Sequence, residues 1–267
     1  QQIQASVVVE SLNATLNEHA LDRPVVATPD DFKLNDLECY MRGRVRYRGK
    51  MNTAAIDAFV AFSKEHDTDG ARCFVDAAGM DAKAFFNLGT EDEPGHADFT
   101  AYVKLEKTAE FKALLEIAGK KLTQKTLAEW LEDWQEYVQP YNGEGEAVDI
   151  VKAIAAVRRI EINASRKEDH DEQQFRASRS ALESVEARSD HGMPAGFRFT
   201  CIPYQGLEKR SFEVRLSILT GDDKPVLVTR IRRLEQQQEN MGNEFMEKLK
   251  VAFEENKMNT FLGNFSA

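Results

Sequence analysis

Five basic residues at alternate positions are the residues of this sequence best suited to bind a polyanion. Residues 42–50 alternate cations with Gly, Val or Tyr, and the cations are Arg42, Arg44, Arg46, Arg48 and Lys50. In a β-strand this spacing puts every cation on one face. Because like charges on one face repel each other, that face needs water or a polyanion opposite it. The segment therefore predicts a strand that binds the phosphates of DNA or RNA.

The same spacing also fits two structural roles without nucleic acid. The basic face is solvated and pairs with the chain's own carboxylates, or it meets an acidic surface on a neighbouring subunit. Tyr47 would point to the opposite face, which disfavours base stacking within the same footprint. Two further basic clusters, Arg158–Arg159 with Arg166–Lys167 and Arg230 with Arg232–Arg233, would extend one basic surface if they lie on the same side.

Residues suited to catalysis are sparse. The sequence contains neither of the phosphate-binding glycine motifs GxxxxGK[ST] and GxGxxG. No Ser or Cys lies in a recognisable nucleophile motif. Dense groups of His and acidic residues occur only at residues 66–69 and 169–172, in polar stretches where neighbouring side chains point in different directions. We expect no catalytic residue, no metal and no cofactor. The alternative is a metal-dependent hydrolase, and His96 is either a functional residue or a hydrogen-bonding residue of its loop.

Composition indicates a folded protein with an acidic surface. The chain has 267 residues, a formal net charge of -10 and 42% hydrophobic residues. The acidic balance disfavours a generic nucleic-acid coat but permits a local basic site. Three widely spaced cysteines, Cys39, Cys73 and Cys201, indicate reduced thiols. With no signal peptide and no apolar run long enough for a bilayer, we expect a cytoplasmic protein that does not enter a membrane.

The elements that would position these residues mix helices and strands. Hydrophobic spacing predicts an N-terminal helix, then the basic strand and a helix capped by Thr53. A hairpin and a third strand follow, and then two helices capped by Thr108 and Thr123 and one more helix. The expected ranges are 3–21 (helix), 42–50 (strand), 54–65 (helix), 71–77, 82–88 and 99–106 (strands), 108–118, 124–138 and 146–157 (helices).

The C-terminal part predicts an antiparallel meander. Strands are expected over 197–204, 211–219 and 225–232, and a covering helix over 234–253, whereas 173–188 fits either strand or helix. The fold class is therefore α+β: a mixed helical and antiparallel-sheet N-terminal half, then a meander with a covering terminal helix. Asn142–Gly145 predicts a boundary between halves 1–143 and 144–267, which are two domains or one continuous domain.

Several short motifs resemble the YfdQ-like family of phage and prophage proteins, a domain of unknown function. They are Asp36-Leu37-Glu38 before the basic segment with Phe59 after it, Gly95–Asp98, Leu122–Gln124 with Glu129 and Glu132–Asp133, and Phe197–Leu216 with Ile202-Pro203. Phe111 and Leu114-Leu115 stand where relatives often carry Trp. The resemblance spans roughly residues 30–260. It implies a phage origin and the cytoplasm of a bacterial host, and it supplies no catalytic residue.

These observations predict a non-enzymatic phage accessory protein. It would form homo-oligomers and bind nucleic acid through residues 42–50 during phage replication or recombination. The alternative is a host-directed inhibitor or a structural assembly protein that acts through protein–protein contacts of its acidic surface. The residues for that role are Glu91–Glu93 with Glu144, Glu146 and Asp149.

Overall fold

The computed structural model describes residues 38–160, 193–219, 225–256 and 258–266. The chain divides into two units, residues 1–47 and 48–267. The predicted helix over 3–21 and the ambiguous stretch 173–188 lie outside the described residues. Helices and two five-stranded sheets make up the second unit, so the α+β fold class is confirmed. No helix within the described ranges is long and apolar enough to cross a membrane.

The first sheet has the strand order β1-β4-β3-β2-β10. Its strands are β1 (Gly49–Thr53), β2 (Arg72–Asp76), β3 (Asp81–Phe85), β4 (Phe99–Lys104) and β10 (Asn259–Leu262). The predicted hairpin and third strand are confirmed, because β2, β3 and β4 pair antiparallel. The two edge strands, β1 on β4 and β10 on β2, pair parallel to their neighbours and make the sheet mixed. The sequence did not predict β10.

Two helices cover one face of the first sheet. They are α2 (Ile56–Glu65) and α7 (Leu234–Phe253), and the rings of Phe59 and Phe253 meet edge-on at 6.2 Å. The predicted Thr53 cap is wrong, because Thr53 ends β1 and α2 begins after Ala55, which makes no side-chain cap. The Thr53 hydroxyl instead accepts a hydrogen bond from the Ala55 amide at 3.1 Å.

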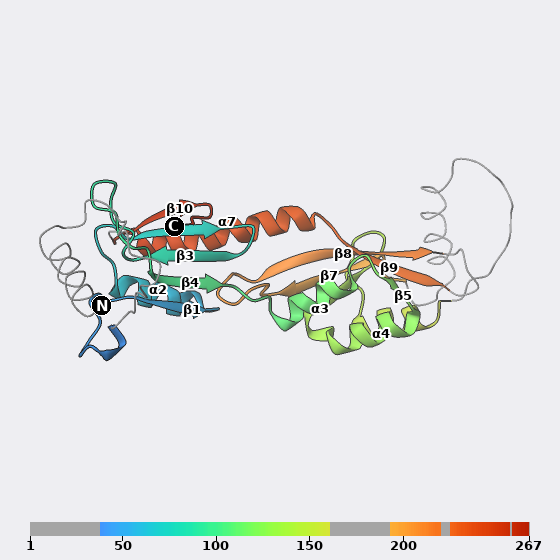
Figure 1. Ribbon diagram of the computed structural model, residues 1–267. Helices are drawn as coiled ribbons and strands as arrows, with labels where there is room; N and C mark the ends of the chain where they lie inside the picture. Colours follow the sequence, from blue (N-terminus) through green and yellow to red (C-terminus); the bar gives the residue numbers. More distant parts are fainter. Residues whose placement is uncertain (1–37, 161–192, 220–224, 257, 267) are drawn as a thin grey trace, which may run out of the picture. The chain divides into compact units, whose positions relative to one another are not determined.

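Helix α7 has the predicted range and spacing. Figure 1 shows it running along the first sheet. Its residues Met241, Phe245, Leu249 and Phe253 are all buried. A side chain at Gly242 would lie 2.6 Å from the Ala77 carbonyl, so glycine permits the close approach of the helix to the β2–β3 turn. Polar contacts also fix the helix, because Glu244 accepts from Arg210 at 2.6 Å and from the Glu208 amide at 2.7 Å.

The second sheet is the predicted meander with two added strands. Its order is β5-β9-β8-β7-β6, and every neighbouring pair is antiparallel. The strands are β5 (Lys121–Leu122), β6 (Val138–Tyr141), β7 (Gly196–Cys201), β8 (Arg210–Leu219) and β9 (Val226–Ile231). The helix predicted over 124–138 ends at Asp133, and residue 138 begins β6 instead. Pro140 lies within β6, an edge strand, where a missing N–H removes no bond of the sheet interior.

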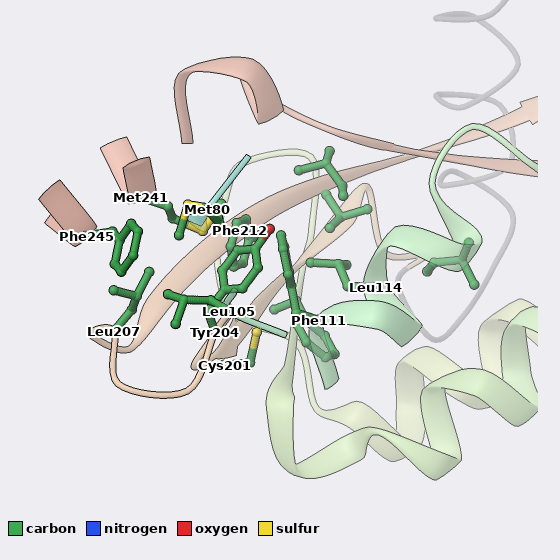
Figure 2. Close-up of a cluster of buried hydrophobic side chains, with 14 of the residues drawn as sticks. Met80, Leu105, Phe111, Leu114, Cys201, Tyr204, Leu207, Phe212, Met241 and Phe245 are labelled. Carbon is green, nitrogen blue, oxygen red and sulfur yellow. The ribbon is translucent and has the colours of Figure 1, made fainter. Parts of the chain in front are cut away.

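Three helices pack on one face of this second sheet, and Figure 1 shows two of them, α3 and α4, beside it. They are α3 (Ala109–Ile117), α4 (Gln124–Asp133) and α5 (Ile150–Arg158). Phe111 of α3 stacks on Phe212 of β8 with 5.1 Å between ring centroids, and Trp130 of α4 lies 5.5 Å from Phe199. Figure 2 shows Phe111 and Phe212 in the core beside Tyr204.

The helix starts follow capping chemistry. The Thr108 and Thr123 side chains accept hydrogen bonds from the amides of Phe111 and Thr126, as predicted, and Asp149 caps α5 in the same manner. The turn at Asn142–Gly145 joins β6 to the segment before α5. Strands β5 and β6 precede residue 143 and belong to the second sheet, whereas β10 follows it and belongs to the first. The division of the chain into halves at residue 143 stays a prediction.

Candidate nucleic-acid interface

The basic segment 42–50 is not the predicted strand. β1 begins at Gly49, so Lys50 alone of the five cations lies in a strand, and the chain bends through residues 41–43 and 45–46. The Val45 amide donates to a Glu38 carboxylate oxygen at 3.1 Å, a local contact that an extended strand would not make. Alternation alone predicted the strand, but Gly43 and this side-chain contact favour bends. The five cations therefore do not share one face, because residues at alternate positions lie on the same side of the backbone only in a strand.

The five cations also belong to different units. Arg42, Arg44 and Arg46 lie in the first unit and Arg48 and Lys50 in the second. Arg42, Arg44 and Lys50 are exposed, and Arg46 and Arg48 are partly buried. Their role as nucleic-acid contacts stays a prediction.

A different set of cations shares one face of the second sheet. The helices α3, α4 and α5 cover one face, and the other face carries the residues of alternate parity along each strand. We call that surface the cationic face; its exposed basic residues are Lys121, Arg198, Arg215, Arg230 and Arg232. Among the residues of β5 to β9, Glu213 is the only acidic residue. In a chain of net charge -10, the face therefore concentrates positive charge against the overall balance.

Strand register sets the spacing of these cations. Arg215 lies directly opposite Arg230 across β8 and β9, and Arg198 lies opposite Glu213 across β7 and β8. Directly opposed residues have Cβ atoms about 4.5–5.5 Å apart, and a like-charged pair at that distance destabilises a sheet. Neither Arg215 nor Arg230 makes an ion pair with a described residue. Arg215 also acts on Glu213, two residues away on the same face, and helps to lower its pKa. A bound polyanion would add further compensation for the repulsion between Arg215 and Arg230.

Glu213 orders one end of the cationic face. The guanidinium of Arg232 donates to both of its carboxylate oxygens, at 2.8 and 2.9 Å. These bonds hold the pKa of Glu213 below its ordinary value and raise the pKa of Arg232. Both side chains are 41% exposed, so Arg232 remains accessible to a ligand beside its partner.

An aromatic ring supports the neighbouring arginine. Tyr141 of the edge strand β6 lies opposite Gly196, where the absence of a side chain leaves room for its ring. Its hydroxyl donates to the Val214 carbonyl at 3.1 Å, and burial, with Glu213 as the second cause, raises the pKa of the phenol. The guanidinium carbon of Arg198 lies 5.9 Å from the ring centroid, a cation–π distance. The ring therefore orients Arg198 while its charge stays available.

The other sequence-predicted groups stay apart from this face. Arg158 pairs with Glu132 of α4 at 2.8 Å, on the helical side of the sheet, and residues 166–172 lie outside the described residues. In the described part of the chain, no three His, Cys, Asp or Glu side chains are grouped to hold a metal ion. His96 is exposed on the β3–β4 connection. Glu91–Glu93 are exposed in that same connection, whereas Glu144 and Glu146 follow β6.

The sequence did contain a signal for the cationic face, but a dispersed one. Arg230 and Arg232 stood out as a cluster, whereas Arg198 and Arg215 are single cations within separate strands. Each strand alternates buried and exposed residues, and its exposed positions carry the cations. Counting charge over the outward positions of all three predicted strands would have identified the face. A search for cations in one continuous run could not.

Comparison with known proteins places the chain in a family without assigning an activity. The match to the family described as "Uncharacterized conserved protein (DUF2303)" covers residues 1–265. No curated protein matches the chain, and no solved structure matches it. Because the family match covers nearly the whole sequence, the chain belongs to the uncharacterised conserved protein family DUF2303.

Proposed function

We propose that this protein is a non-enzymatic accessory protein that binds nucleic acid through the cationic face of its second sheet. The observation that carries the proposal is a set of five exposed cations, four within the strands and Arg232 directly after β9, with a single carboxylate among those strands. Guanidinium groups bind phosphates by two parallel hydrogen bonds, so arginine suits a phosphate-binding surface better than lysine. Contacts to the phosphate backbone of a nucleic acid do not depend on its base sequence.

The arrangement of the cations supports a polyanion rather than a single phosphate. Neighbouring strands lie about 4.8 Å apart, so cations on β7, β8 and β9 spread across about 10 Å of sheet. Successive phosphates along one nucleic-acid strand span a comparable length. A linear polyanion can therefore meet several of these cations at once, whereas an isolated phosphate meets one or two.

Salt-dependent binding tests this proposal. Each neutralised phosphate releases counterions, so the logarithm of the affinity falls with the logarithm of salt by about 0.7–0.9 per contact. Labelled single-stranded and duplex oligonucleotides should bind more weakly as salt rises. The double variant Arg215→Glu with Arg230→Glu should bind more weakly at every salt concentration, and its salt slope should be smaller by the contribution of about two phosphate contacts.

A matched variant separates local from global charge. Lys152→Glu makes the same change of charge as the single variant Arg230→Glu, at an exposed position in the first turn of α5, on the helical side of the second sheet. It should leave binding near that of the unaltered protein. Equal losses in the Lys152 and arginine variants would reject the cationic face, and absence of binding at low salt would reject nucleic acid as the ligand. Pull-downs from host lysate would then test the host-directed role of the acidic surface.

The biological setting of the proposal comes from the sequence resemblance. The YfdQ-like motifs support a phage or prophage origin, action in the host cytoplasm, and a role in phage replication or recombination. We further propose that the protein self-associates, since a repeated phosphate-binding face gains affinity when copies bind one strand together. A solution mass that is a multiple of 30.2 kDa would support self-association, and a monomer at micromolar concentration would contradict it.

A further inference from the structure

Three phenylalanines stack on the face of the first sheet opposite helices α2 and α7, where Phe74, Phe261 and Phe265 are partly exposed and the neighbouring Phe85 is buried. The ring of Phe74 on β2 lies nearly parallel to that of Phe265, with 4.7 Å between centroids and 14° between planes. It also lies nearly parallel to that of Phe261 on β10, at 5.5 Å and 24°. Phe85 meets Phe265 edge-on at 5.6 Å. Phe261 and Phe265 are 43% and 40% exposed, so much of their surface faces solvent.

Cations lie between these rings on the same face. Strand register places Lys83 opposite Phe74 and Arg72 opposite Phe85, and the Lys83 ammonium lies 4.5 Å from the centroid of the Phe85 ring. Tyr102 of β4 lies opposite Lys83, and Lys50 of β1 lies opposite Thr100, the neighbour of Phe85. Lys83 therefore lies between the aromatic residues Tyr102 and Phe74, and Arg72 lies next to Phe85.

The acidic residues of this face gather at one end, and partners occupy them. Asp76 accepts from the Gly79 amide at 2.9 Å and from Asn264 at 3.0 Å, and these bonds lower the pKa of its carboxyl. Asp81 pairs with Lys104 at 3.1 Å. The residues that the strand register places beside Lys50, Arg72 and Lys83 across the sheet include no carboxylate. The charged side chains beside the stacked rings across the sheet are therefore all positive.

We propose that this second surface, the stacking face, binds single-stranded nucleic acid. Its members are Phe74, Phe261, Phe265, Arg72, Lys83 and Lys50. Bases of a single strand stack on the exposed rings of Phe261 and Phe265, and the three cations contact the adjoining phosphates. A duplex cannot use the rings, because its bases already stack on each other. The inference rests on the proposed function for its ligand class and adds a strand preference that the cationic face does not supply.

An abasic strand gives the sharpest test, because it keeps the phosphates and removes the bases. Unaltered protein should bind a single strand at least about tenfold more tightly than an abasic strand of the same length. The variant Phe261→Ala with Phe265→Ala should abolish that difference and leave duplex affinity and salt slope unchanged. A 2-aminopurine base in the strand should lose fluorescence on binding to the unaltered protein only.

Leu262→Ala is the matched control. Leu262 neighbours Phe261 on β10, points to the opposite face and is 65% exposed, so its removal takes away comparable exposed apolar surface. It should retain the preference for bases. Equal affinity for normal and abasic strands would overturn the stacking face, as would a base preference that survives in the phenylalanine variant. A change of solution mass in that variant without loss of single-strand binding would identify a contact between copies and overturn it too.

The two proposals fail in different ways. Loss of duplex binding in the Arg215/Arg230 variant together with a retained base preference supports both surfaces. Duplex binding without base preference leaves the cationic face standing and rejects the stacking face. Absence of all nucleic-acid binding in unaltered protein rejects both.

Discussion

Arg215 and Arg230 lie directly opposite each other on neighbouring strands β8 and β9, both exposed and on the same face of the sheet. A like-charged pair in this position is destabilising, whereas an opposite-charge pair stabilises the sheet by about 0.2–1 kcal/mol relative to an Ala–Ala pair. The variant Arg230→Glu turns the repulsion into an attraction. We expect its free energy of unfolding to rise by up to about 1 kcal/mol in urea titrations at low salt, while its affinity for nucleic acid falls.

Opposite effects on stability and binding would show that the pair is retained for its ligand. Arg230→Gln should give an intermediate stability, since it removes the repulsion without adding an attraction. High salt should reduce the stability differences among the three proteins, because salt screens exposed charges. A loss of stability in Arg230→Glu would contradict the assigned repulsion.

Glu213 should limit the affinity of the cationic face. The variant Glu213→Gln removes the only carboxylate among the strands of the second sheet and leaves Arg232 with a neutral amide oxygen in place of its two charged acceptors. We expect tighter binding of duplex and single-stranded oligonucleotides. The dependence of the affinity on salt should become steeper by the contribution of about one phosphate contact. Unchanged affinity would show that Arg232 does not reach the ligand.

The same residue should make stability depend on pH. Arg232 lowers the pKa of Glu213 in the folded protein, so Glu213 stabilises the fold above its ordinary pKa of 4.5. That contribution is lost as pH falls through the lower folded pKa. The stability difference between unaltered protein and Glu213→Gln should thus be constant near neutral pH and disappear in acid, as urea titrations across this range would show.

The three thiols should differ sharply in reactivity. Burial raises the pKa of Cys73 and of Cys201 to about 12, so neither forms thiolate at neutral pH, whereas Cys39 is exposed. Ellman's reagent should label one thiol per chain in native protein and three in urea. The variant Cys39→Ser should show none until it unfolds. Rapid native labelling of a second thiol would contradict the buried positions.

Gly196 is the one glycine within strands β5 to β9 and should tolerate substitution poorly. A Cβ there would overlap the Val214 carbonyl and lie 2.5 Å from the Tyr141 hydroxyl, so Gly196→Ala forces backbone or ring to move. We expect a loss of about 1–3 kcal/mol in unfolding free energy and weaker binding, because Tyr141 supports Arg198. Gly49→Ala, with no atom within 4 Å of the added Cβ, is the matched control and should change stability little.

The sequence predicted elements with strong local signals. Thr108 and Thr123 marked helix starts because a cap is a contact between near neighbours in sequence. The spacing of Met241, Phe245, Leu249 and Phe253 identified α7 for the same reason. By contrast, β6 and β10 owe their pairing to distant strands, and nothing within four residues reveals such a partner.

The same distinction between contacts of near neighbours and pairing of distant strands applies to the candidate site. The alternation of Arg42 to Lys50 was a local signal, yet a local contact of Glu38 and the conformational freedom of Gly43 outweighed it. The pair Arg215 and Arg230 becomes visible only when two strands are set in register. An alternating pattern therefore assigns residues to the two faces of a sheet only after the strand itself is established. The spacing of residues in the sequence does not by itself establish a strand.

Strand β10 is synthesised long after the rest of the first sheet. Its partner β2 emerges from the ribosome far earlier, and the Asp76–Asn264 hydrogen bond closes a separation of 188 residues. Until β10 arrives, β2 is an edge strand with unpaired backbone groups beside an uncovered Phe74, the kind of edge that recruits other chains. Ribosome-bound chains that stop before β10 should therefore be aggregation-prone, and folding of this sheet should depend on chaperone protection until β10 has left the ribosome.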